Sequence, residues 1–281
     1  MQYVLFNDQI VTRGEVTIDF EDRGYNFGDG IYEVISVYNQ QPFLLTEHFE
    51  RFFESAKKLD MAVPYQHETF YSLIRQLIEK NNVNCGLIYI QMTRGISPRN
   101  HLYERDPEIT PIITGFSKEW PANGHAKKEG VHALTTEDIR WLRCDIKTIN
   151  LLGNVLAKRK AADNQCYEAI LHRGNDVTEG SSSNIFIIKD GVLYTHPATN
   201  LILNGITRQF VLSLVDELHI DVVLEPFTLE QLKNADEVFM TSTGNEVTPI
   251  ISIEGTIQQT YPVGPVTRDL QRCFSESIEA L

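Results

Sequence analysis

Residues 166–195 have the sequence CYEAILHRGNDVTEGSSSNIFIIKDGVLYT, which contains three apolar runs of strand length at 167–171, 184–188 and 192–195. Turns rich in Gly, Asn and Ser separate these runs. Because strand follows strand here without an intervening helix, the stretch favours an α+β or mixed α/β fold over a doubly wound parallel sheet.

The sequence on both sides of this stretch mixes helices and strands in the same way. We predict a strand near 131–134 and a helix at about 151–164 before it. After it, we predict a helix at about 207–218, strands at 222–224 and 238–241, and a helix near 265–279. The C-terminal half is therefore expected to be one mixed α/β domain.

The first half of the chain opens with short strand-like runs and continues with helical spacing of apolar residues. We predict strands at 3–6, 9–12, 31–38, 87–92 and 112–116, and helices that include 49–59 and 70–77. The segment KEWPANGHAKKEG at 118–130 has the composition of a linker. We therefore predict two domains, at residues 1–119 and 131–281, joined by a linker at 120–130.

The composition is that of an ordinary globular protein, with 42% hydrophobic and 22% charged residues. The 25 Lys and Arg residues against 38 Asp and Glu residues give a net charge of −13, which disfavours nucleic acid and anionic membranes as partners. We find neither a signal peptide in Met1–Thr12 nor a run approaching the roughly 18 apolar residues of a membrane span. Four scattered cysteines form no metal-binding spacing, so we expect a cytoplasmic protein with reduced thiols and no metal.

Lys147 lies in CDIKTIN at 144–150, between Ile146 and Ile149. A lysine amine that apolar neighbours shield from water is more readily neutral, and a neutral amine can form a Schiff base. A solvated lysine on a strand edge explains the same pattern.

Glu179 begins EGSSSN at 179–184, directly before an apolar strand. A carboxylate there could keep a pyridine nitrogen protonated and make the ring an electron sink. The alternative is a turn in which Ser and Asn side chains bond to the backbone.

Two segments have the features of anion-binding turns. NGIT at 204–207 opens a predicted helix, whose free N–H groups favour an anion. TSTGN at 241–245 ends a predicted strand with hydroxyl groups and a glycine. For each segment, the alternative is an ordinary helix cap or turn.

Three basic side chains are candidate ligands for a carboxylate or phosphate: Arg51 on the first helix, and Arg99 with His101 in a loop shaped by Pro98. The alternative is that they are solvated surface residues.

The order of these features resembles the fold-type IV pyridoxal-phosphate enzymes, and among them the bacterial D-amino acid aminotransferases. The matching stretches cover most of the chain: EDRGYNFGDGIYEV (21–34), EHFERF (47–52), TRGISPRNH (93–101), EDIRWLRCDIKTINLL (137–152), CYEAILHR (166–173), VTEGSSSNIF (177–186), LNGITR (203–208) and FMTSTGNEVTP (239–249).

The resemblance implies a two-domain fold with pyridoxal 5'-phosphate between the domains. Lys147 would carry the cofactor and move the proton at the substrate α-carbon, and Glu179 would pair with the ring nitrogen. Leu203 would pack on the ring, and the phosphate would be bound by Arg51, Ile206, Thr207, Ser242 and Thr243.

The same resemblance implies a homodimer that transfers the amino group of D-alanine to 2-oxoglutarate, giving pyruvate and D-glutamate. Tyr32, Arg99 and His101 would hold the substrate carboxylate, the last two from the partner subunit. Gly244 departs from the family pattern, in which we expect a bulkier hydroxyl-bearing residue, and this bears on substrate range.

Three readings within the fold compete with this one: a branched-chain L-aminotransferase, an (R)-amine aminotransferase and an aminodeoxychorismate lyase. Outside it, a binding protein for phosphorylated metabolites would use the same two turns without turnover. Such a binder needs no Schiff-base lysine, so Lys147 discriminates between the two classes.

Overall fold

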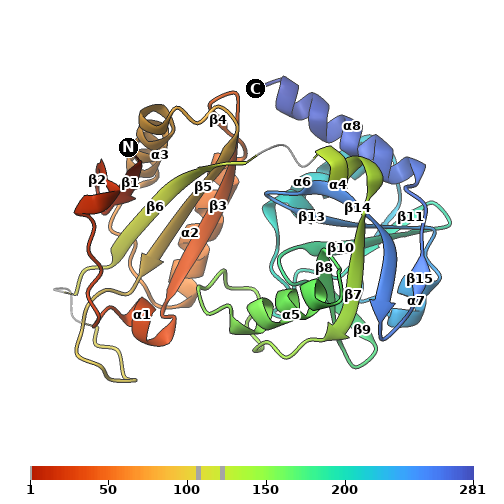
Figure 1. The fold of residues 1–281 in the computed structure, drawn as a ribbon, viewed down its shortest axis with the longest axis horizontal. Coiled ribbons are helices and arrows are strands. Elements are labelled where there is room, and N and C mark those ends of the chain that lie inside the picture. Colours follow the sequence, from red (N-terminus) through yellow and green to blue (C-terminus); the bar gives the residue numbers. More distant parts are fainter. Residues whose placement is uncertain (1, 106–108, 121–123) are drawn as a thin grey trace. The chain divides into compact units, whose positions relative to one another are not determined.

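The computed structural model describes residues 2–105, 109–120 and 124–281, and the chain forms two compact units (Figure 1). Unit 1 comprises Met1–Pro121 with Ile146–Asn150 and Leu281, and unit 2 comprises Ala122–Asp145 with Leu151–Ala280. The predicted division placed Ile146–Asn150 in the C-terminal domain, whereas in the structure this segment belongs to unit 1. Part of the expected linker, Gly124–Glu129, forms helix α4.

Unit 1 contains an antiparallel sheet in the order β2-β1-β6-β5-β3-β4. Its elements are β1 (Tyr3–Phe6), β2 (Gln9–Thr12), the 3-10 helix η1 (Arg13–Glu15), α1 (Arg23–Phe27), β3 (Gly30–Tyr38), β4 (Gln41–Pro42), α2 (Leu45–Lys58), α3 (His67–Asn81), β5 (Gly86–Thr93) and β6 (Ile112–Glu119). The five strands predicted in this half are confirmed.

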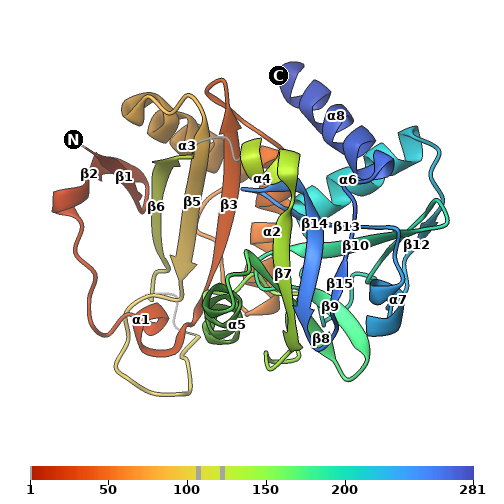
Figure 2. The same cartoon turned by 45° about the vertical axis from the view of Figure 1, so that its right-hand side comes forward.

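The core of unit 1 forms where α2 and α3 pack against one face of this sheet. Phe49 and Phe52 of α2 and Phe70 of α3 are fully buried, with ring centroids 5.0 and 5.5 Å apart for the pairs that include Phe70. Side chains of β3 alternate between the faces: Ile31 and Glu33 are buried beneath the helices, whereas Tyr32 lies on the other face and is half-buried. Figure 2 shows α2 running alongside β3.

Unit 2 contains a mixed sheet in the order β12-β11-β10-β13-β14-β7-β8-β9, with β15 paired to β14. Pairs β14·β7, β7·β8 and β11·β12 are parallel. Its elements after α4 are β7 (Val131–Glu137), α5 (Leu152–Asp163), β8 (Glu168–Arg173), β9 (Asp176–Gly180), β10 (Asn184–Lys189), β11 (Val192–Thr195), α6 (Ile206–Glu217), β12 (Val222–Val223), α7 (Leu229–Lys233), β13 (Glu237–Ser242), β14 (Glu246–Gly255), β15 (Gln259–Thr260) and α8 (Pro265–Glu279). The mixed α/β class is confirmed.

The sequence-based prediction missed the strands β9 and β14, as well as the short elements β4, β15, α1, α4 and α7. Strand β9 has the sequence DVTEG, which lacks the apolar alternation of a typical strand, yet Thr178 and Glu179 in it are buried. Their burial is tolerated because these polar side chains are hydrogen-bonded to other polar groups. Apolar periodicity cannot reveal such a strand. Across the described residues, no helix is long and apolar enough to cross a bilayer, and no group of three or more His, Cys, Asp or Glu side chains could hold a metal ion.

Candidate active site

Lys147 lies on a segment that extends the sheet of unit 1 at the free edge of β3. The N–H of Tyr32 donates to the Lys147 carbonyl at 3.0 Å, and the N–H of Ile149 donates to the Gly30 carbonyl at 3.0 Å. Together with the bridge between Ile31 and Thr148, these bonds satisfy the backbone of β3 at its edge. The short segment Ile146–Asn150 is thus fixed in position, and Lys147 with it.

The Lys147 side chain is half-buried, and its Nζ lies 4.3 Å from the ring centroid of Tyr32. This contact is a cation–π interaction when the amine is protonated. The Tyr32 ring in turn stacks on Tyr89 at 5.6 Å, which orients it. Lys147 is therefore not a lysine that projects from a strand edge into water.

Arg51 of α2 is buried and is bound to the fully buried Glu33 of β3. Arg51 Nε donates to Glu33 Oε1 at 2.7 Å and Nη2 donates to Oε2 at 2.8 Å, while His48 Nδ1 donates to Oε2 at 2.7 Å. Burial alone would raise the pKa of Glu33, but Arg51 and His48 hold it well below its usual range. Glu33 therefore fixes the guanidinium of Arg51 in one orientation.

Sequence analysis did not single out Glu33 or His48. Glu33 stands in an apolar strand pattern at 30–38, at a position whose neighbours Ile31 and Ile35 are buried. A charged residue at a core position of a strand must be paired, so this position was the available signal.

Arg99 and His101 are exposed, and both contact Phe27 of α1. The Arg99 guanidinium lies 5.1 Å from the Phe27 ring centroid, and the His101 ring lies 5.6 Å from it. Buried Arg23 donates to the Asn100 carbonyl at 2.6 Å, which anchors the loop. The described contacts bring Arg99 and His101 together, but they do not join them to Tyr32.

Glu179 of unit 2 lies in β9 and not in a turn, and its carboxylate is buried and hydrogen-bonded on both oxygens. Oε1 accepts from Arg140 Nη1 at 2.5 Å, and Oε2 accepts from Asn184 Nδ2 at 3.1 Å and from the Leu203 N–H at 3.0 Å. Burial raises the pKa of the Glu179 carboxyl to about 7, although Arg140 opposes this shift. Burial and Arg140 therefore act on the pKa of this carboxyl in opposite directions.

Arg140 is itself held by Asp138, whose side chain is fully buried. Arg140 Nε donates to Asp138 Oδ1 at 2.9 Å and Nη2 donates to Oδ2 at 2.8 Å. Arg173 Nε also donates to Asp138 Oδ2, at 3.1 Å. Sequence analysis assigned no role to these three residues, although Asp138 and Arg140 stand in one of the quoted family stretches.

The turn before α6 is tied to Glu179 through Asn184. Asn184 Nδ2 bridges the Glu179 carboxylate and the Leu203 carbonyl, at 3.1 and 2.9 Å. A Cβ on Gly205 would collide with the Asn184 amide oxygen, so only glycine lets the turn lie this close. Ile206 and Thr207 then open α6 with buried side chains, and the N–H groups of such a first turn have no partner within the helix.

The second predicted turn follows β13. Asn245 closes it, because its N–H donates to the Ser242 carbonyl at 3.2 Å and its Nδ2 donates to Ser242 Oγ at 2.9 Å. Ser242 and Thr243 are half-buried. Two buried polar atoms next to these turns, Arg208 Nε and Thr241 Oγ1, have no hydrogen-bond partner among the described residues.

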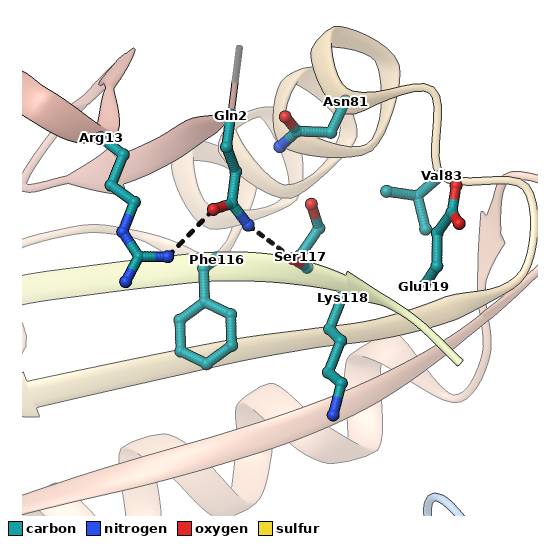
Figure 3. A pocket seen from close by; sticks show the side chains of 8 residues that line it. All are labelled: Gln2, Arg13, Asn81, Val83, Phe116, Ser117, Lys118 and Glu119. Carbon is teal, nitrogen blue, oxygen red and sulfur yellow. Dashed lines mark hydrogen bonds between the residues drawn. The ribbon is translucent and has the colours of Figure 1, made fainter. Parts of the chain in front are cut away.

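A different surface pocket, of about 560 Å³, lies in unit 1 (Figure 3). Arg13 in its lining donates to Gln2 Oε1 at 3.0 Å, and Gln2 Nε2 donates to the Ser117 carbonyl at 3.3 Å. None of the predicted site residues lines it. We therefore give this pocket no role in the reaction.

Comparison with known proteins shows which proteins the whole chain is similar to. The family model for amino-transferase class IV matches residues 30–253. A D-alanine aminotransferase of Listeria innocua is 50% identical over 276 residues, which are 98% of this chain and 96% of that protein. One of Staphylococcus haemolyticus is 49% identical over 280 residues, covering 100% and 99% of the two chains. The crystal structure of the Escherichia coli branched-chain amino acid aminotransferase has a TM-score of 0.88 at 27% identity, covering 98% of this chain and 94% of that one.

Proposed function

The chain belongs to the class IV aminotransferase family, and from this premise we propose that it transfers the amino group of D-alanine to 2-oxoglutarate, with pyridoxal 5'-phosphate as cofactor. The observation that carries the proposal is 50% identity over 98% of the chain with an enzyme named D-alanine aminotransferase. Identity to the branched-chain enzyme of known structure is only 27%. The D-amino acid reading is therefore preferred to the branched-chain L-aminotransferase, (R)-amine aminotransferase and lyase readings.

The residues of both units fit such a cofactor. In unit 2, a carboxylate offers about four lone-pair sites, and Glu179 uses three of them, so that one remains for a ring N–H. The close-packed turn at Gly205, the first turn of α6 and the hydroxyl groups of Ser242 and Thr243 suit a phosphate. Arg208 Nε and Thr241 Oγ1, for which the described part of the chain offers no hydrogen-bond partner, add hydrogen-bonding capacity beside the two turns.

We assign roles on this basis. Lys147 holds the cofactor covalently, Glu179 bonds its ring nitrogen, and Leu203 packs on the ring. Ile206, Thr207, Ser242 and Thr243, with Arg51, bind the phosphate. The bound cofactor supplies an electron sink that makes the substrate α-proton acidic.

Once the substrate amine had displaced it from the cofactor, the Lys147 amine would be free to act as the acid and base that moves this proton, because one positioned amine can take it up and return it. Its fixed backbone at the edge of β3 and the Tyr32 ring at 4.3 Å restrict where the amine can reach. Tyr32, Arg99 and His101 are assigned to the substrate carboxylate.

Arg99→Ala is expected to raise KM for D-alanine by about 10- to 100-fold, because a charged hydrogen bond contributes about 1.5–3 kcal/mol. Cofactor affinity should stay close to that of the unmodified protein, since Arg99 is exposed and contacts Phe27 in unit 1. Steady-state kinetics and cofactor titration measure the two effects. Arg105→Ala, in the same loop and paired with Asp60, is the control. Purification of the Arg99 variant without cofactor would contradict the assignment.

We also propose a homodimer, with Arg99 and His101 serving the partner subunit's site. Exposed apolar side chains support a second copy as the partner. Helix α5 exposes Leu152, Val155 and Leu156 along one face, at spacings of three and four residues. The preceding loop exposes Ile139, Trp141 and Leu142, and these six residues are 46–73% exposed. So much apolar surface is typical of an interface.

Leu156→Lys is expected to convert the dimer to monomer, because burying an unpaired charge at an interface costs several kcal/mol. The fold should persist, since Leu156 is 58% exposed in the single chain. Sedimentation equilibrium gives the mass, and circular dichroism gives the fold. Gln76→Lys, at an exposed position of α3, adds the same charge elsewhere and should leave the mass unchanged. A dimer of unchanged affinity in the Leu156 variant would rule out this face.

We propose a cytoplasmic location. The four cysteines support it, because Cys85, Cys144, Cys166 and Cys273 are all free thiols in the structure, as expected for a reducing compartment.

The test of the function is a titration of the purified protein with D-alanine and, separately, L-alanine. The visible absorption of lysine-bound cofactor should fade with D-alanine and pyruvate should form. Fading with L-alanine instead would favour the branched-chain reading. A colourless protein that does not respond to added cofactor would favour the binding protein for phosphorylated metabolites.

A further inference from the structure

Arg140 and Glu179 form one of the tightest ion pairs in unit 2. Arg140 Nη1 lies 2.5 Å from Glu179 Oε1, and the two side chains are 6% and 7% exposed. Both groups are therefore shielded from water. In such an interior the attraction between two opposite charges is far stronger than at the surface. Arg140 therefore influences both the ionisation and the position of the Glu179 carboxyl.

This pair is the end of a row of four charged side chains of alternating sign. Arg173 contacts Asp138 at 3.1 Å, Asp138 contacts Arg140 at 2.8 Å, and Arg140 contacts Glu179. Asp138 also accepts from Thr178 Oγ1 at 3.1 Å, which holds it beside β9. The row is neutral as a whole, so Arg140 stays ionised despite its burial.

A carboxyl group beside a ring nitrogen can share one proton with it in two ways. With the proton on nitrogen the two groups form an ion pair, and with the proton on the carboxyl both are neutral. Burial favours the neutral arrangement, since it raises the pKa of Glu179. Arg140 opposes burial, because a cation beside the carboxyl stabilises its ionised form.

We propose that Arg140 is a positioning residue for the reaction: by holding Glu179 ionised through Nη1, it keeps the shared proton on the ring nitrogen of the cofactor. The inference rests on the proposed function, in which Glu179 bonds that nitrogen. A protonated ring is the better electron sink, so charge held at Glu179 controls how acidic the substrate α-proton becomes. Arg140 acts through Glu179 and does not itself contact substrate.

The direct test is 15N NMR of the holoenzyme loaded with pyridoxal 5'-phosphate that carries 15N at the ring position, because this resonance reports protonation of that nitrogen. In the unmodified protein, the resonance should be that of a protonated ring at pH 7.5. In Arg140→Gln, the 15N chemical shift should move toward the value of an unprotonated ring. In Arg140→Lys, which restores a cation, the shift should lie close to that of the unmodified protein.

Kinetics should follow the same order. In Arg140→Gln we expect kcat to fall by about 10- to 100-fold, by analogy with the loss that follows when the hydrogen-bond partner of a metal-binding residue is removed. KM for D-alanine should change less, since the side-chain hydrogen bonds of Arg140 go to Asp138 and Glu179, which are not assigned to the substrate carboxylate. Arg143→Gln, four residues before Lys147 and paired with Asp145 at 3.0 Å, is the matched control and should leave the resonance unchanged.

Arg140→Gln leaves Asp138 with one cation fewer, which destabilises the fold, so Asp138→Asn/Arg140→Gln is the second variant. It removes both charges of the buried pair, and the remaining Arg173 is partly exposed and can be hydrated. The double variant should show the same shift toward the neutral ring. A protonated-ring resonance in either folded, loaded variant overturns the proposal. If the unmodified protein binds no cofactor, it is the proposed function that fails, and this outcome is separate.

Discussion

Replacing Lys147 by alanine is expected to reduce steady-state transamination by at least about 10³-fold, because positioned acid–base catalysis alone contributes about 10²- to 10⁴-fold. The variant also loses the covalent attachment of the cofactor. The fold should be kept, since the backbone bonds of the segment, from Tyr32 to Lys147 and from Ile149 to Gly30, do not depend on the side chain. Turnover is measured as pyruvate formed from D-alanine and 2-oxoglutarate.

Lys147→Arg separates the two possible uses of the side chain. Arginine keeps a cation over the Tyr32 ring but is not deprotonated in proteins, so it cannot attack a carbonyl or move the α-proton. We expect the arginine variant to be as inactive as the alanine variant. Lys128→Ala, an 80% exposed lysine of α4, should retain full activity. Near-normal turnover in either Lys147 variant would remove Lys147 from the mechanism and leave the binding-protein reading in place.

The sequence predicted the parts of this protein that are carried by local pattern. Five of the strands of unit 1 and several of those in unit 2 follow from apolar periodicity. The family, which was recognised from motifs in a particular order, is confirmed by the comparisons. Lys147 was singled out from its apolar neighbours, and the structure adds that its segment covers the edge of β3. That pairing joins residues more than a hundred positions apart, which no local pattern can show.

The partners in the buried ion pairs could not be predicted from the sequence for the same reason. Arg140 and Glu179 are 39 residues apart, and each taken alone has the features of a solvated residue in a polar stretch. Arg51 was considered, but its partner Glu33 lies 18 residues earlier in a strand. Pairing of buried charges depends on how strands and helices meet, so it becomes visible only in the structure.

Glu33→Gln is expected to lower the free energy of unfolding by about 3–5 kcal/mol, the usual effect of removing one member of a buried ion pair. Glu33 is fully buried, and without its charge the Arg51 guanidinium remains in the core with no compensating anion. Urea unfolding of the cofactor-free protein measures the change. Glu54→Gln on α2 is the control, because Glu54 pairs with Lys58 at the surface, where such pairs contribute little.

The free energy of unfolding should also depend on pH through Glu33, and Glu33→Gln should lose this contribution. Its sign follows from the lowered pKa of the Glu33 carboxyl. Arg51 and His48 hold the pKa of this carboxyl below that of a glutamate in the unfolded chain, about 4.3, so the unfolded state binds the proton first. The stabilisation is therefore complete above about pH 5 and is lost as the pH falls through the unfolded and then the folded pKa. The difference between the unmodified protein and Glu33→Gln should be constant from pH 6 to 8 and shrink below pH 4. A difference that grew on acidification would mean that Glu33 is protonated in the folded protein, and then Arg51 would be held by something other than an ion pair.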